Sequence, residues 1–275
     1  MSDPVPAVLE SDAIGEIAAI FADIRAVYRV GAVNLIWRHL ATIPGALPWA
    51  WRMVRPVYVD DTIARVAEAF KADMVSPVLP SVPPEVFAAI GLSYHDLSEI
   101  RNVLSAYDRT NSMALIALTA LTGWDDPVSQ TPHAISLPQA PPAHRALPLP
   151  ALTPVDAMPP HLAALVERLN RFGTSQERPI LASMYRHLSH WPAYLGIAWT
   201  ALAPTATNGS LDAAIDATSR RARMHAMSIK MMGGPPPIDS RDQILAAIQP
   251  FRTEVLVKMV VICGMLLRMT PEQDA

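Results

Sequence analysis

Apolar side chains recur at spacings of three and four residues along most of the chain, which is the period of amphipathic α-helices. No segment combines strict apolar–polar alternation with the turn dipeptides of a hairpin, so no strand is predicted. The pattern predicts an all-α protein with helices over residues 12–28, 33–42, 47–55, 60–74, 84–90, 95–121, 160–172, 177–188, 192–201, 210–232 and 241–268.

Individual residues refine the ends of these helices. Asp12 is the expected cap of the first helix. Pro44 and Pro56 are expected to end the second and third, because proline disfavours helical backbone before it. The last helix is expected to break near Pro250. Residues 112–121, SMALIALTAL, are apolar on all sides, so the helix over 95–121 is expected at the centre of the core.

The chain also contains an internal repeat. Residues 37–56, WRHLATIPGALPWAWRMVRP, match residues 185–204, YRHLSHWPAYLGIAWTALAP, without a gap at an offset of 148, and eight of the twenty positions are identical. Such a match marks a repeated structural unit. The main difference between the copies is His190 in the second, where the first has Thr42.

The repeat predicts the domain organisation. A first helical unit spans residues 10–124 and a second spans 160–270, joined by a linker over 125–159 that holds nine prolines. Proline fixes φ and removes a backbone donor, so the linker is expected to be irregular. Two similar units are expected to pack as a pseudo-dimer. A pocket between them is then the natural ligand site.

Composition narrows the class of protein and its partners. Apolar residues make up 51% of the 275 residues, yet the longest apolar runs, Met113–Leu118 and Met259–Leu267, are far shorter than a membrane span. The 22 basic and 25 acidic residues nearly balance, which disfavours nucleic acid as a partner. The first twenty residues are acidic, unlike a secretory or transit signal. Cys263 is the single cysteine, so no intrachain disulfide is possible. A cytoplasmic protein without a membrane partner is expected.

The candidate chemistry rests on His190 and Asn111. His190 lies in the last helical turn before Pro192. Its ring either satisfies the last carbonyls of that helix or serves as a general base, since a neutral imidazole accepts a proton from water. Asn111 opens a very apolar stretch, where a buried amide needs partners. These are either groups of its own helix or a substrate carboxylate or water.

Other polar patterns are interpreted as structural. The pairs Arg38–His39 and Arg186–His187 occupy matching positions in the two copies. A catalytic residue in an asymmetric site needs no such counterpart, so both pairs are interpreted as helix-capping residues. The eight histidines form no HExxH motif and no cysteine cluster accompanies them, so no metal site is predicted.

These features together resemble a known family, the group I α-haloacid dehalogenases, which act on D- and L-2-haloacids. The resemblance covers residues 14–268 and rests on the repeat, the helical pattern, the Ser-x-aromatic-Pro turn at 189–192 and an asparagine before an apolar helix. It implies a hydrolase in which an aspartate activates a water that attacks the substrate α-carbon and expels halide. No covalent ester and no cofactor take part, and the pocket lies between the halves.

The resemblance also implies site residues. Ser189 matches the family serine and Asn111 the asparagine, while His190 stands at the position of the catalytic aspartate. His190 would then be the base, Ser189 and Asn111 would orient water and a small carboxylate substrate, and Trp37 and Tyr185 would wall the cavity. Two alternatives stay open, a hydrolase of another small acid and a non-catalytic small-acid binding or sensing protein. Internal symmetry can replace dimerisation or accompany it, so a homodimer is also an alternative.

Overall fold

A computed structural model describes residues 5–123, 148–231 and 234–272. Every regular element in these ranges is helical, which confirms the all-α class. The first half contains α1 (Gly15–Tyr28), α2 (Leu35–Leu40), α3 (Ala46–Val59), α4 (Thr62–Ala72), α5 (Pro84–Ala89) and α6 (Tyr94–Thr122). The second contains η3 (Val155–Ala157), α7 (Pro160–Asn170), α8 (Ser183–Leu188), α9 (Pro192–Thr207), α10 (Ser210–Ala226), η4 (Ile238–Ser240), α11 (Arg241–Pro250), the π-helix η5 (Phe251–Val255) and α12 (Leu256–Met269).

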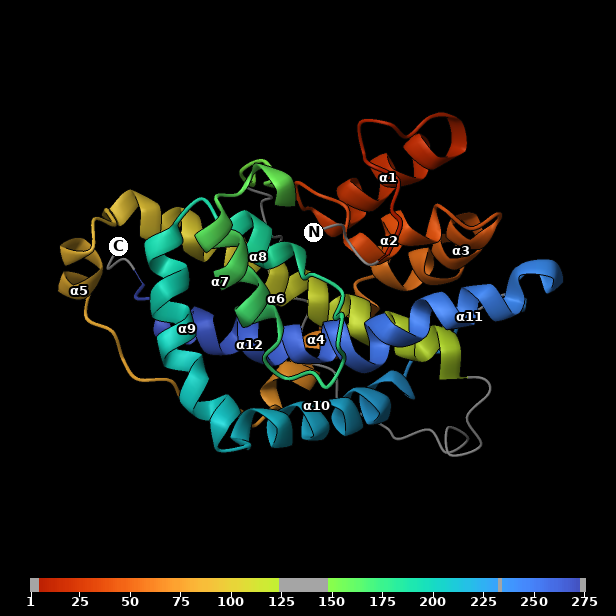
Figure 1. Ribbon diagram of the computed structural model, residues 1–275. Helices are drawn as coiled ribbons and strands as arrows, with labels where there is room; N and C mark the ends of the chain where they lie inside the picture. Colours follow the sequence, from red (N-terminus) through yellow and green to blue (C-terminus); the bar gives the residue numbers. More distant parts are fainter. Residues whose placement is uncertain (1–4, 124–147, 232–233, 273–275) are drawn as a thin grey trace.

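The two halves repeat one packing plan. Helix α1 packs on α3 and α3 on α4, just as α7 packs on α9 and α9 on α10. Between the halves, α6 packs along α12 and α4 contacts α10 (Figure 1). Each short helix packs on a helix of the other half. Helix α8 contacts α6 of the first half, and α2 contacts α11 of the second. Both halves therefore contribute short helices to the packing around α6 and α11.

The core sits along α6 and α12. Side chains such as Ile116 and Leu118 of α6 and Val261 and Ile262 of α12 are fully buried. The predicted central position of the helix over 95–121 is confirmed. No helix in the described ranges is both long enough and apolar enough to cross a bilayer.

Prolines set fewer boundaries than the sequence indicates. Helices α3 and α9 run through Pro56 and Pro204, which are repeat counterparts, so the predicted stop at Pro56 is wrong. A proline removes one backbone donor, and packing along the rest of the helix can outweigh that loss. The predicted break near Pro250 is confirmed, because α11 ends at Pro250 and the wider π-turn of η5 follows directly before α12.

Two other helix starts differ from expectation. Helix α1 begins at Gly15 after Ile14, without a side-chain cap, so Asp12 does not cap it. Residues 177–182 are not helical, and α8 begins only at Ser183. Pro179 accounts for this difference, because it restricts its own backbone and that of the residue before it. Residues 125–147 of the predicted linker lie outside the described ranges.

Candidate functional site

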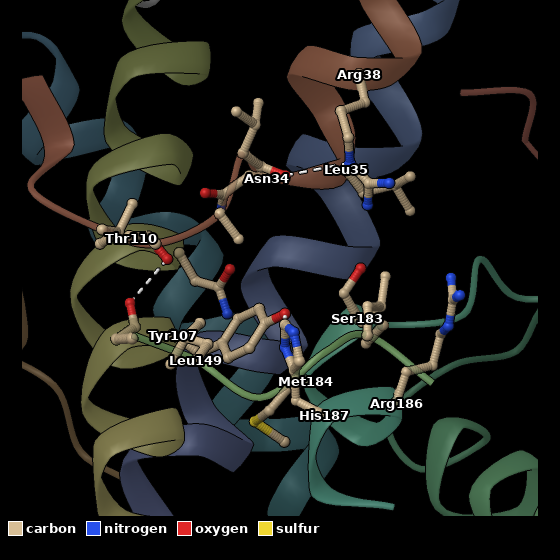
Figure 2. Close-up of a pocket in the computed structure, with 18 of the residues that line it drawn as sticks. Asn34, Leu35, Arg38, Tyr107, Thr110, Leu149, Ser183, Met184, Arg186 and His187 are labelled. Carbon is tan, nitrogen blue, oxygen red and sulfur yellow. Dashed lines mark hydrogen bonds between the residues drawn. The ribbon is translucent and has the colours of Figure 1, made fainter. Parts of the chain in front are cut away.

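A cavity of about 730 Å³ lies between the two halves. This volume is typical of sites for small molecules. Figure 2 shows that its walls come from α2, α6 and the start of α8, with the segment around Leu149 beside them. Residues of η5 and α12 complete the lining. In the described part of the chain, the cavity thus combines residues of both halves.

Two extended segments lie over the cavity, and we call them the first strap (residues 5–11) and the second strap (residues 148–154). Residues 9–11 of the first strap line the cavity. The Val8 N–H donates to the Arg38 carbonyl (3.0 Å), and His39 Nδ1–H donates to the Pro6 carbonyl (2.7 Å). The first strap is therefore fastened to α2, the short helix of its own half.

The second strap is fastened to α8 in the same manner. Arg186 Nε donates to the Thr153 carbonyl (2.9 Å), and Ser189 Oγ donates to Thr153 Oγ1 (2.9 Å). His190 Nε2–H donates to the Ala151 carbonyl (2.7 Å). The strap supplies Leu149 and four further lining residues (Pro150, Ala151, Leu152 and Pro154).

Four polar side chains from α6 and α8 line the cavity, and we call this set, Tyr107, Asn111, Ser183 and His187, the polar wall. Tyr107 OH and His187 Nδ1 share a hydrogen bond of 2.8 Å. The buried Ser183 Oγ lies beside Tyr107 and interacts with its phenol, partly offsetting the rise that burial causes in the pKa of Tyr107. The Asn111 amide bonds to no carbonyl of its own helix in the described structure, unlike the hydroxyls on either side of it. The Asn111 amide is therefore available to a ligand.

Positive charge adjoins the polar wall. Arg38 is buried and donates through Nε to the Val33 carbonyl (3.2 Å). Arg38 and its repeat counterpart Arg186 both line the cavity. Figure 2 shows Arg38 reaching from α2 toward Ser183, with Tyr107 and His187 meeting at their tips.

This environment controls protonation of the polar wall. Burial, together with the neighbouring charges of His190, Arg186 and Arg38, lowers the pKa of His187 to about 4. His187 is therefore a neutral imidazole near pH 7. Burial raises the pKa of Tyr107 well above its usual range, so its phenol stays protonated.

Glu10 is the one acidic side chain among the described lining residues. Its carboxylate accepts a hydrogen bond from the Val33 N–H (2.8 Å) and forms an ion pair with Arg25. Its negative charge is thus already engaged away from the polar wall. No group of three or more potential metal-ligating side chains occurs within the described ranges.

The structure separates the residues that the sequence placed in one site. Asn111 lines the cavity. His190 does not, because its exposed ring holds the second strap, so the expectation that it points into the cavity is wrong. Ser189 also bonds to that strap. Trp37 and Tyr185 are fully buried and do not line the cavity.

The last two residues belong to the core for clear reasons. Trp37 turns toward α1 and α3, where its Nε1–H donates to Tyr28 OH (3.0 Å) and its ring lies edge-on to Trp51. Burial raises the pKa of Tyr185 above its usual range. The expected role of both as cavity walls is therefore corrected to a role in packing.

The sequence interpretation missed the twinned arginines and His187. The pairs Arg38–His39 and Arg186–His187 were set aside because an asymmetric site needs no repeated residue. A cavity shared by both halves, however, receives residues from each copy at the same repeat position. The charged pair that is identical in both copies is the signal that could have identified them.

Comparison with known proteins finds similarity to 2-haloacid dehalogenases. The configuration-inverting 2-haloacid dehalogenase of Alcaligenes xylosoxydans xylosoxydans is 30% identical over 126 residues, a match that spans 44% of this chain and 42% of that protein. The match thus covers less than half the length of this curated relative. No protein-family profile matches the chain.

Solved structures match over nearly the whole chain. A D-2-haloacid dehalogenase complex with L-LA has a TM-score of 0.74 and 19% identity, with 98% of this chain and 97% of that chain covered. A mutant D-2-haloacid dehalogenase with D-2-CPA has a TM-score of 0.67 and 20% identity, with coverages of 98% and 94%. At these identities the likeness shows a shared fold. The chain has the all-α fold of these D-2-haloacid dehalogenases, and 126 of its residues are similar in sequence to a configuration-inverting 2-haloacid dehalogenase.

Proposed function

We propose that this chain is a haloacid dehalogenase-like hydrolase that binds a small 2-haloacid in the cavity between its halves. The observation that carries the proposal is the pairing of the polar wall with two arginines, one from each repeat, in an otherwise mainly apolar cavity. The relatives named above are 2-haloacid dehalogenases, which supports the same substrate class.

The substrate carboxylate is assigned to Arg38 and Arg186. Within the described residues, no carboxylate lies within ion-pair distance of Arg38, whose guanidinium is nevertheless buried. A buried charge is costly unless it is paired. A carboxylate ligand would supply the missing charge, and guanidinium–carboxylate hydrogen bonds are among the stronger ones in proteins.

The attacking water is assigned to Asn111 and His187. In this proposal the water oxygen forms a bond to the substrate α-carbon, while the carbon–halogen bond breaks and its electron pair leaves with the halide. The water proton passes to His187, whose Nε2 accepts it when Nδ1–H donates to Tyr107. A neutral imidazole is required for this step, and the low pKa of His187 provides it.

Substrate binding would also make His187 a stronger base. In the free protein, the positive charges of Arg186 and Arg38 disfavour an imidazolium. A bound carboxylate offsets those charges, so the pKa of His187 is expected to rise in the complex. The base would therefore gain strength only when the substrate is present.

A second function, binding or sensing of a small acid without turnover, is favoured by one specific observation. The family resemblance implies an aspartate base, yet Glu10 is the one carboxylate among the described lining residues and is engaged with Arg25 and the Val33 N–H. In that case the same cavity would bind the carboxylate and release it unchanged.

Halide release from the two enantiomers of 2-chloropropionate tests the proposal. Wild-type protein is expected to release chloride, and His187→Asn to lose roughly a hundredfold to ten-thousandfold in kcat, as for removal of a general base. His190→Asn is the matched control and is expected to keep kcat within severalfold. Binding of 2-chloropropionate without chloride release would instead establish the second function. An equal loss of kcat in both variants would contradict the assignment to His187.

A further inference from the structure

The repeat relates lining residues on two neighbouring parts of the cavity, α6 and the η5–α12 segment that packs along it. At the offset of 148, Tyr107 corresponds to Val255 and Asn111 to Met259. All four side chains line the cavity, the first two from α6 and the others from η5 and α12. Equivalent positions therefore carry polar groups in the first half and apolar groups in the second.

The short helices show the same replacement. Ser183, the first residue of α8, corresponds to Leu35, the first residue of α2, and both line the cavity. Helix α8 packs on α6, whereas α2 packs on α11. Ser183 therefore lies on the α6 side of the cavity and Leu35 on the α11 side. We call Leu35, Phe251, Val255 and Met259 the apolar wall, the counterpart of the polar wall.

The backbone of the apolar wall is unusual. Phe251 and Val255 are the first and last residues of the π-helix η5, and both line the cavity. The Phe251 ring also packs near His39, with the two ring centroids 5.8 Å apart. Single π-helical turns within α-helices occur frequently at functional sites. Here the turn presents two large apolar side chains to the ligand space.

The cavity is larger than a short haloacid requires. Sites of this volume, about 730 Å³, bury most of the surface of drug-sized ligands. The arginines account for the carboxylate and the polar wall for the attacking water, while the halogen leaves on the side of the α-carbon opposite that water. The remaining space borders the apolar wall, which offers no hydrogen-bonding side chain.

We propose that the preferred substrate is a 2-haloacid whose other α-substituent is an apolar chain longer than methyl, seated against the apolar wall. This inference rests on the proposed function, since it assigns the carboxylate to the two arginines and the attacking water to the polar wall. Each methylene transferred from water to an apolar site improves binding by about fourfold. The gain is expected in KM, because contacts remote from the reacting bond act equally on bound substrate and transition state.

The test is a series of 2-bromoalkanoates from 2-bromopropionate to 2-bromooctanoate, with bromide release and direct binding both measured. For wild-type protein, KM and Kd are expected to fall by about threefold to fourfold per added methylene until the apolar wall is covered. Val255→Phe and Leu35→Phe fill this space from two different elements. Each is expected to remove the gain for the longer acids while 2-bromopropionate still binds.

Val59→Phe is the matched control, because it adds the same bulk at the exposed end of α3. It should keep the chain-length dependence of the wild type. Using both filling variants guards against one that fails to fold, which thermal unfolding would reveal. Turnover of 2-bromopropionate with no gain for longer acids would overturn this inference and leave the proposed function intact. Tighter binding of longer acids without bromide release would support the apolar wall and contradict the hydrolase.

Discussion

His187 is held as a neutral imidazole by its surroundings. It is buried, it lies within the influence of Arg38 and Arg186, and its Nδ1 is fixed by Tyr107 at 2.8 Å. Each of these features disfavours the imidazolium or restricts the ring. Near pH 7, such an imidazole accepts a proton more readily when a bound carboxylate offsets the neighbouring positive charges.

His187→Asn is expected to weaken the dependence of stability on pH. The pKa of His187 is lowered from 6.5 to about 4 in the folded protein. Between these values the unfolded chain binds a proton that the folded protein does not, so stability falls as the pH drops from 6.5 toward 4. At about pH 5 the loss is about 2 kcal/mol relative to neutral pH. Urea unfolding of both proteins at neutral pH and at about pH 5 measures this difference. An equal loss in both proteins would show that the His187 imidazole titrates normally.

The histidines also show how far single residues could be interpreted from the sequence. His190 differs from its counterpart Thr42, and this difference suggested a special role. The structure gives His190 a contact with the second strap, whereas His187, which is repeated as His39, lies in the cavity. The sequence shows that the two histidines lie close together along the chain. It does not show which of their side chains faces the cavity after the second strap packs against α8.

At the scale of elements, the straps connect the site to the rest of the chain. Each strap covers the short helix of its own half and contributes apolar lining residues. A histidine fastens each one, with His39 bonded to Pro6 and His190 bonded to Ala151. Because these contacts lie outside the cavity, they are expected to control access of the ligand rather than the reaction itself.

His190→Ala tests the role of the second strap. The variant loses the donor to the Ala151 carbonyl, and the loss of one such bond corresponds to about twofold to tenfold in an equilibrium constant. KM and the dissociation rate of 2-chloropropionate are expected to rise by that factor, with kcat changed by less than about twofold. Steady-state kinetics and stopped-flow binding separate these effects. A fall in kcat of a hundredfold or more with unchanged KM would return His190 to the reaction and contradict the assignment to the strap.

Helix existence was predictable from the sequence, whereas several boundaries were not. The periodic pattern anticipated each long helix because an amphipathic helix must bury one face. It failed at Pro56, where tertiary packing continues the helix through a residue that usually ends one. It also treated the region over 125–159 only as a linker, although residues 149–154 form part of the site. Short segments without periodicity carry no signal for such a role.

At the scale of the whole molecule, duplication explains why the site has two unlike walls. Both halves use the same packing plan, and their short helices cross onto the long helices of the opposite half. Equivalent positions then face one cavity from two sides, where they have diverged into Tyr107 and Asn111 on one side and Val255 and Met259 on the other. The repeat was visible in the sequence. The crossing that brings the two copies to one cavity depends on three-dimensional packing and was not.

The most direct test of this account is the protonation of His187 with and without a bound acid. Histidine side chains labelled with nitrogen-15 would be followed by NMR as the pH is varied, in free protein and with saturating 2-chloropropionate. We predict that the free protein shows a His187 pKa of about 4, that the ligand raises it, and that His190 responds little. A His187 pKa that is unchanged by the ligand, or a shift confined to His190, would contradict a carboxylate site between Arg38, Arg186 and the polar wall.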